Sequence, residues 1–409
     1  MFDALFTTTT EYKKLSHALS GKGACALFGL PASGRAQVYA ALCRQLDKPL
    51  CIVTPGEAEA TRFAADLNTL GIPAAVFPAR DYVLRPIEGT AREYEYRRLA
   101  VLGELVGGRL RAVAVPAEAL TQFTTPKEDF CANTRTLHAG DTLLRDDLLA
   151  ALFGAGYTRR AQVDGPGQFS VRGDIVDIFA PDQKMPVRME FWGDEIDTLH
   201  TFDLTTQRRE DAIDKFYLSP AREVLFGKPA DAAEQLRAFL AKQRGKKKTA
   251  MTDCMAADLD LLDGGAVPVN MDKYLAVRYP HPATVLDYFD DPILVAEEPA
   301  SIREADRATA YRRGEELKSL ILDGVLCAGL DNLYADPSYL WSKTGHYRTI
   351  CAENFARSMP DQPLKDIINA PAHTLPAWNG EVAGLLEDLK PLCDAGYTVT
   401  LLAGTDRAA

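Results

Sequence analysis

Short apolar runs alternate with helix-like stretches in the first part of the chain. The apolar runs lie at 24–30, 50–54, 74–77 and 112–116, and the stretches with helical spacing lie at 35–46, 57–70 and 91–106. Strands that alternate with helices are typical of a parallel sheet, because a crossover between parallel strands needs a helix-length connection. The pattern therefore predicts an α/β domain, entered through a helix within residues 1–20.

The spacing changes to period two between residues 169 and 202. The runs Val171–Phe179, Val187–Trp192 and Glu195–Phe202 are separated by short segments that contain Gly, Pro or Asp. Alternation between such turn residues predicts an antiparallel meander with one packed face and one wet face. In the second run, one face would hold Val187, Met189 and Phe191, and the other Arg188, Glu190 and Trp192. In the third run, one face would hold Ile196, Thr198, His200 and Phe202.

The meander interrupts an α/β pattern that resumes near residue 219. We expect one α/β domain in two segments, 1–127 and 217–324, split by an inserted α+β domain at 128–216. A small C-terminal α/β domain is expected at 325–409, with strands at 347–351 and 398–403 around a helix at 380–395. Since a parallel-sheet unit rarely ends directly after a strand, we expect the sequence to be the N-terminal part of a longer protein.

The turn after the first predicted strand has the spacing of a phosphate-binding loop. Such a loop reads Gly-x-x-x-x-Gly-Lys-Ser/Thr between a strand and a helix, and here Gly29 and Gly34 match it. Arg35 and Ala36 stand where the lysine and the hydroxyl residue belong. Glu297 ends a later apolar strand, as the acidic motif of nucleotide hydrolases does, but alanine offers no second magnesium ligand. We predict a degenerate loop that keeps its backbone shape but has lost the side chains that bind phosphate and magnesium.

Composition narrows the remaining function classes. The 409 residues carry a formal net charge of −11, which disfavours a protein whose main task is to hold nucleic acid. A DNA-binding scaffold that uses Arg97–Arg98 and Lys246–Lys248 stays an alternative, although Arg244–Lys248 is expected to be a solvated loop. The eight cysteines are isolated and no apolar run is long enough for a membrane span. A cytoplasmic protein without a metal or cofactor is therefore expected.

Trp192 is the exception to the expected polarity of the meander. It shares a face with Arg188, about 13 Å away along the strand, on the side that is expected to be wet. An exposed indole beside an arginine is typical of a protein-binding anchor. The other interpretation is that Trp192 closes the edge of its own small core, and the pattern alone leaves both open.

Two stretches in this region resemble a known family. Residues 172–181 read Arg-Gly-Asp-Ile-Val-Asp-Ile-Phe-Ala-Pro, and residues 187–197 read Val-Arg-Met-Glu-Phe-Trp-Gly-Asp-Glu-Ile-Asp. They closely resemble the module shared by the excinuclease subunit UvrB and the transcription-repair coupling factors (Mfd). The degenerate loop and the segment Leu286-Asp-Tyr-Phe fit the coupling factors better, because UvrB is expected to keep the intact Lys-Ser/Thr pair.

The resemblance implies a partner and three contact residues. In this family the inserted domain docks on the repair protein UvrA, and the matching positions here are Arg172, Arg188 and Trp192. Tryptophan stands where the coupling factors can have phenylalanine, which keeps an aromatic side chain. The polymerase-binding domain and the DNA translocase motor lie beyond this region in the family, so contacts to RNA polymerase and DNA are expected only outside it. A UvrB-like DNA-dependent ATPase or helicase domain is the enzymatic alternative.

Whether Arg172 shares the face of Arg188 and Trp192 depends on the register of the hairpin. A shift of one residue would turn Arg172 to the opposite side of the sheet. The sequence leaves this register open.

Overall fold

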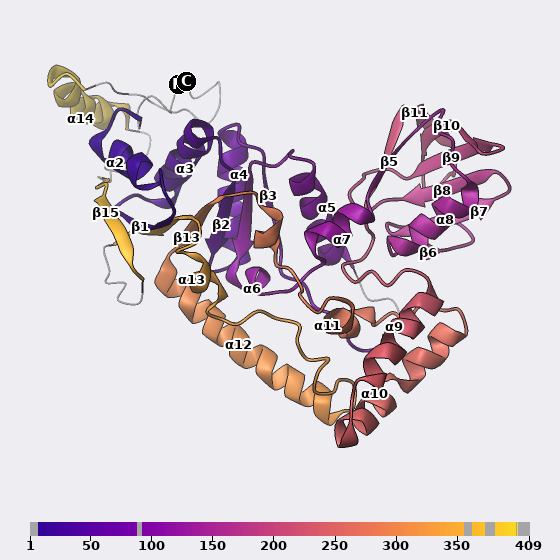
Figure 1. Ribbon diagram of the computed structural model, residues 1–409. Coiled ribbons are helices and arrows are strands. Elements are labelled where there is room, and N and C mark those ends of the chain that lie inside the picture. The colour runs from indigo at the N-terminus through magenta and orange to yellow at the C-terminus, as the bar shows by residue number, and fades with distance from the viewer. Residues whose placement is uncertain (1–6, 88–91, 356–361, 373–380, 398, 400–409) are drawn as a thin grey trace. The chain divides into compact units, whose positions relative to one another are not determined.

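The computed structural model describes residues 7–87, 92–355, 362–372, 381–397 and 399, and Figure 1 shows its ribbon. The chain divides into two compact units, Met1–Ala370 and Pro371–Ala409. Within the described residues the first unit holds a seven-stranded sheet in which every pairing is parallel. Its strands, in spatial order, are β15 (Leu364–Asn369), β1 (Gly23–Phe28), β14 (Arg348–Glu353), β13 (Ile293–Glu297), β2 (Leu50–Thr54), β4 (Ala112–Pro116) and β3 (Ala74–Val76).

Helices cover both faces of this sheet. Alternate residues of each strand enter opposite cores, so that Ile52 packs on one side and Cys51 and Val53 on the other. The first core is closed by α2 (Thr10–Ala18), α3 (Ala32–Leu46) and α4 (Glu57–Thr69). The second core is closed by α5 (Glu93–Val106), α6 (Ala117–Leu120), α7 (Lys127–Ala132), η2 (Val285–Tyr288), α12 (Pro299–Leu322) and α13 (Tyr339–Lys343). This confirms the predicted α/β fold.

The last part of the first unit differs from the expected domain division. The strand predicted at 347–351 forms as β14, but it pairs with both β1 and β13, and β15 pairs with the outer side of β1. Strands β14 and β15 therefore complete the main sheet and do not build a sheet of their own. The connection from β13 to β14 runs through α12, a long crossover helix, and a strand that follows such a helix has the same sequence pattern in either sheet.

The second unit contains α14 (Val382–Asp394), which agrees with the helix expected at 380–395. The strand expected at 398–403 lies outside the described residues, apart from Val399. No helix in the described ranges is long and apolar enough to cross a membrane.

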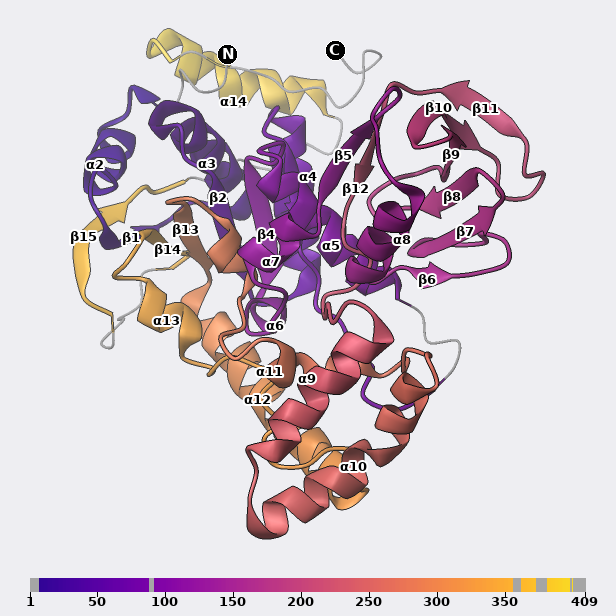
Figure 2. The same cartoon turned by 45° about the vertical axis from the view of Figure 1, so that its right-hand side comes forward.

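The inserted domain is built around a six-stranded sheet, seen from two directions in Figures 1 and 2. Helix α8 (Arg145–Gly154) packs on one face through Leu148 and Leu152. A separate antiparallel pair, β5 (Arg135–His138) with β12 (Lys215–Leu218), stands where the chain enters and leaves the domain. The sheet strands, in spatial order, are β11 (Arg209–Ala212), β10 (Glu195–Phe202), β9 (Val187–Trp192), β8 (Ile175–Phe179), β7 (Gln168–Arg172) and β6 (Thr158–Arg159).

The predicted antiparallel meander is confirmed for β7 to β10, and two details differ. The edge strand β6 pairs in parallel with β7, so the sheet is mixed. A register shift between Ile196 and Thr198 also breaks the expected alternation of β10. Ile196 and Leu199 enter the core opposite Phe191 and Met189, whereas Phe202 faces the other side. The prediction that Ile196 shares a face with Phe202 is wrong, because a bulge changes the phase of the strand.

A helical segment follows the inserted domain. It contains α9 (Pro229–Ala241), α10 (Gly245–Asp263), η1 (Met271–Tyr274) and α11 (Leu275–Arg278), which share a core with the end of α12. The expected loop at Arg244–Lys248 is wrong, since α10 begins at Gly245 and carries Lys246, Lys247 and Lys248 exposed in its first turn. Lysine is a good helix former, so an exposed basic run fits a helix as well as a loop.

Candidate functional site

One face of the inserted sheet brings the three candidate residues together. Ser170, Asp177, Arg188 and His200 form one row of cross-strand partners, and the next row on the same face is Arg172, Ile175, Glu190 and Thr198. Trp192 follows Glu190 by two residues on β9 and pairs with Glu195. Because residues two apart on a strand point to the same side, Arg172, Arg188 and Trp192 share this face. We call it the 172/188/192 face.

Asp177 holds the two arginines of this face. The Nε and Nη2 atoms of Arg188 donate to its two carboxylate oxygens at 2.7 and 2.9 Å, and Nη2 of Arg172 donates to Oδ2 at 2.7 Å. Such charge-assisted, two-point contacts are the strong class of hydrogen bond. The bond to Asp177 is the main reason that the pKa of Arg188 is raised further above its usual range. Both guanidinium groups are thus fixed in place.

The exposure of the three side chains differs greatly. The Arg188 side chain is only 10% exposed; its Nη1 donates to the carbonyl of Gln207 and its guanidinium lies over the ring of Phe202. That ring belongs to a small apolar cluster on this face with Val163 and Phe179. The Arg172 side chain is 48% exposed. One end of the face is therefore covered and the other end is open.

Trp192 lies at the open end. It is 82% exposed and is the last residue of β9, directly before the two-residue turn Gly193–Asp194. Gly193 has a φ of 65°, which suits glycine and allows the tight turn. The interpretation that Trp192 closes its own core is wrong, since its side chain is left in solvent.

The candidate nucleotide loop is shorter than a phosphate-binding loop. Helix α3 begins at Ala32, so Gly34 lies in its first turn and only residues 29–31 connect β1 to the helix. Gly29 has a φ of 93°, and a Cβ there would lie 2.7 Å from the carbonyl oxygen of Ala370. The prediction that the loop keeps its shape is therefore wrong. Three residues are too few to wrap a phosphate with backbone N–H groups.

The side chains that replace the phosphate-binding residues face inward. Arg35 is buried and forms ion pairs with Glu297 at 3.1 Å and Glu298 at 2.9 Å, while the Tyr39 hydroxyl also donates to Glu297. Burial raises the pKa of Glu297 to about 7, against the opposing effect of Arg35. Ala36 is fully buried in the first core. This cluster uses its charges on one another, and no group of potential metal ligands is found among the described residues.

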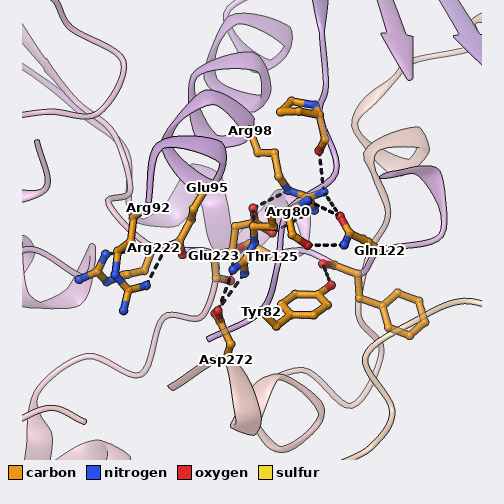
Figure 3. A network of polar contacts seen from close by, with 12 residues as sticks. Arg80, Tyr82, Arg92, Glu95, Arg98, Gln122, Thr125, Arg222, Glu223 and Asp272 are labelled. Atoms are coloured by element: carbon orange, nitrogen blue, oxygen red, sulfur yellow. Dashed lines mark hydrogen bonds and ion pairs between the residues drawn. The ribbon is translucent and has the colours of Figure 1, made fainter. Parts of the chain in front are cut away.

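A second cluster of charges was missed from the sequence and is shown in Figure 3. Arg98 of α5 donates through Nε and Nη2 to Glu223 at 2.6 and 3.1 Å, and both side chains are fully buried. Nε of Arg80 lies 3.2 Å from the same carboxylate, and Arg80 donates from Nη1 and Nη2 to Asp272 at 2.7 and 3.1 Å. Burial opposes ionisation of Glu95, but Arg80, Arg222 and Arg92 together lower its pKa to about 2.

This network connects three parts of the first unit. Arg98 comes from the sheet domain, Glu223 from the segment that leaves the inserted domain, and Asp272 from the helical segment. Its members are far apart in sequence, so no local spacing of residues predicts the network. The network also removes Arg98 from the possible DNA contacts, and Arg97 lies 3.7 Å from Glu57. The DNA-binding alternative therefore loses one of its basic residues.

The comparisons with known proteins agree with this architecture. Residues 136–224, which contain the six-stranded sheet, match the family described as the UvrB interaction domain. The chain is 25% identical over 387 residues to a transcription-repair-coupling factor of Bacillus subtilis, covering 92% of this chain and 33% of that protein. A coupling factor of Mycobacterium bovis is 34% identical over 299 residues, covering 70% and 24%. One of Myxococcus xanthus is 35% identical over 208 residues, covering 48% and 17%.

The fold and these matches define a split α/β domain that carries an inserted UvrB interaction domain. Over most of its length the chain is homologous to the N-terminal third of the transcription-repair-coupling factors. It spans between a quarter and a third of the length of the relatives that match it first.

Proposed function

We propose that this chain is a non-catalytic recruitment module that binds the nucleotide excision repair protein UvrA through the 172/188/192 face. The match of residues 136–224 to the UvrB interaction domain supports a docking role for the inserted domain. Exposed Trp192 on the same face as Arg172 is the observation that carries the choice of surface. Tryptophan and arginine are the residues most enriched among binding hot spots.

The three residues have different tasks in this proposal. Trp192 supplies apolar area that is in solvent before binding and is removed from it in the complex. Arg172 offers donors to a carboxylate or carbonyl of the partner while Asp177 holds it in place. Arg188 is largely covered, so it acts as a positioning residue that fixes Asp177 and through it Arg172. This division leaves two direct contacts and one support.

The module has no enzymatic task in this proposal. The Arg35 ion pairs, the short connection to α3 and buried Ala36 all disfavour a UvrB-like ATPase. Coupling factors are translocases, and their motor lies outside the third that this chain matches. In a longer protein of this kind, the module would bring damage recognition to a stalled RNA polymerase.

A titration of UvrA against arginine variants tests the assignment of the face. Arg172→Ala should weaken binding by about thirtyfold or more, which corresponds to about 2 kcal/mol for a hot-spot side chain. Arg135→Ala is the matched control, because Arg135 is an exposed arginine of the same domain in the separate β5–β12 pair. Affinities of both variants equal to that of the unaltered chain would reject the face, and an equal loss of binding in both would reject it in favour of a non-specific charge effect.

A further inference from the structure

A cleft lies between the inserted domain and the helical segment, away from the 172/188/192 face. Its volume is about 890 Å³, which is within the usual range for ligand sites. It is lined by residues 156–160 and 166–168 of the inserted domain, by residues 222, 224, 226 and 227 of the segment that follows it, and by residues 229, 232, 265–269, 271 and 272 of the helical segment. The corresponding elements β6 and α9 lie near one another in both ribbon views (Figures 1 and 2). None of the residues of the 172/188/192 face lines it.

Four arginines line this cleft, namely Arg92, Arg159, Arg160 and Arg222. Arg92 donates to Glu95 at 2.9 Å and to the carbonyl of Val269 at 2.7 Å. Arg222 lies 3.8 Å from the same Glu95, so two guanidinium groups share one carboxylate. Figure 3 shows them close together beside Glu95. The lining also contains Asp272, but its carboxylate is already taken by Arg80.

Among the described residues the positive charge of the cleft is only partly neutralised, by Glu95 beside Arg92 and Arg222. Arg159 and Arg160 are exposed and form no ion pair with any residue that the structure describes. The Nη1 atom of Arg222 is buried and has no hydrogen-bond acceptor among the described residues. The exposed guanidinium groups of Arg159 and Arg160 can still donate to an anion, and hydrogen bonds from a guanidinium to an ionised acceptor are the strong class. Donor chemistry and charge point to an anionic ligand.

The rest of the lining distinguishes among anionic ligands. Val267 is 53% and Val269 38% exposed, and together they offer an apolar strip beside the arginines. Single-stranded nucleic acid is usually held by bases stacked on exposed aromatic rings. Of the aromatic residues that line the cleft, Tyr157 and Phe226 are buried, half-buried Phe153 packs edge-on against Phe169, and the Tyr96 hydroxyl donates to the carbonyl of Pro166. Arginines next to an apolar strip suit carboxylates interspersed with apolar side chains.

We propose that this cleft binds an extended acidic peptide segment of a partner protein. Its carboxylates pair with Arg159 and Arg160, and its apolar side chains lie on Val267 and Val269. The site is separate from the surface assigned to UvrA, so either assignment can fail without the other. It gives the chain a second docking surface.

The test measures the fluorescence anisotropy of a labelled peptide, in which glutamate alternates with valine and leucine, against the whole chain. Saturable binding is expected, and Arg159→Glu/Arg160→Glu should weaken it by at least about tenfold. Arg135→Glu/Lys215→Glu is the charge-matched control, since both residues are exposed on the β5–β12 pair outside the cleft. Its affinity should equal that of the unaltered chain.

Three further binding measurements test the proposal. A peptide with glutamine in place of glutamate should not bind, and Arg172→Ala should leave peptide binding unchanged. Absence of saturable peptide binding, or equal affinity of the two double variants, overturns the proposal. A labelled oligothymidylate supplies the other contradicting outcome. If it binds the unaltered chain, loses binding in Arg159→Glu/Arg160→Glu, and the acidic peptide does not bind at all, the cleft holds nucleic acid and the proposal is overturned. Unchanged thermal unfolding of each variant verifies that the fold is intact.

Discussion

Arg188 and Trp192 lie four residues apart on the same face of one strand, yet as whole residues Arg188 is 8% exposed and Trp192 is 82% exposed. Arg188 completes the fold by neutralising buried Asp177, whereas Trp192 contributes its ring only to solvent or to a partner. The two residues should therefore respond to substitution in opposite ways. We expect Arg188 to support stability and, through Asp177, the position of Arg172, and we expect Trp192 to serve binding alone.

Arg188→Ala should lower the free energy of unfolding by about 1.5–3 kcal/mol, because it removes the two-point partner of a buried carboxylate that keeps its bond from Arg172. Trp192→Ala should change it by less than about 0.5 kcal/mol, as is usual for exposed positions. Arg188→Lys should recover only part of the loss, since an ammonium group cannot reproduce the forked contact. Urea unfolding followed by circular dichroism measures all three. A stable Arg188→Ala variant would refute the positioning role.

The buried network around Glu223 is expected to be a main support of the first unit. Glu223→Ala would leave Arg98 buried without its carboxylate partner and Arg80 with only Asp272, so the free energy of unfolding should fall by about 3–5 kcal/mol. The control is Arg237→Ala, which breaks the exposed pair with Asp263 and should cost less than about 1 kcal/mol. Similar losses of unfolding free energy in the two variants would mean that the buried network stabilises the protein no more than an exposed ion pair does.

Glu297 should give the stability of the protein a defined pH dependence. Its pKa in the folded protein is about 7, above the ordinary value of 4.5, so the folded state binds this proton more tightly than the unfolded chain. That contribution is complete below pH 4.5 and is lost as the pH rises to about 7. Relative to Glu297→Gln, the unaltered chain should lose stability across this window. Chemical unfolding at several pH values measures the difference, and a difference independent of pH would contradict the raised pKa.

Restoring the phosphate-loop residues should not restore nucleotide binding. In Arg35→Lys/Ala36→Thr the connection from β1 to α3 keeps its three residues, and the new hydroxyl replaces a buried methyl group. The variant should therefore be less stable, by about 1–3 kcal/mol for a buried polar group without a partner. Titration with a fluorescent ATP analogue and magnesium should detect no binding. Saturable, magnesium-dependent binding would revive the nucleotide-hydrolase alternative.

Local patterns gave the elements of the fold and one part of the candidate site. Period-two alternation predicts β9 and the shared face of Arg188 and Trp192, because both lie on one strand. The position of Arg172 depends on pairing across β7, β8 and β9. Register is set by turns and by the packing of the whole sheet, so it was not accessible from one strand.

Other features were hidden because they arise from contacts between distant segments. The bulge at Ile196–Thr198 reverses the expected faces of β10 although its residues alternate regularly. The Arg98–Glu223 pair joins residues 125 positions apart, and nothing in the spacing of either segment indicates the other. The exposure of Trp192 was also open, since the same alternation fits a tryptophan that closes a small core.

Trp192 is the residue of the 172/188/192 face that we expect to contribute most to UvrA binding. The decisive measurement is the dissociation constant of UvrA for Trp192→Ala beside that for Tyr311→Ala, an exposed aromatic residue of α12 at 74% exposure. Trp192→Ala should bind about thirtyfold more weakly or worse, with unchanged thermal unfolding, and Tyr311→Ala should bind as the unaltered chain does. Equal affinities for both variants and the unaltered chain would contradict the assignment of UvrA to the 172/188/192 face.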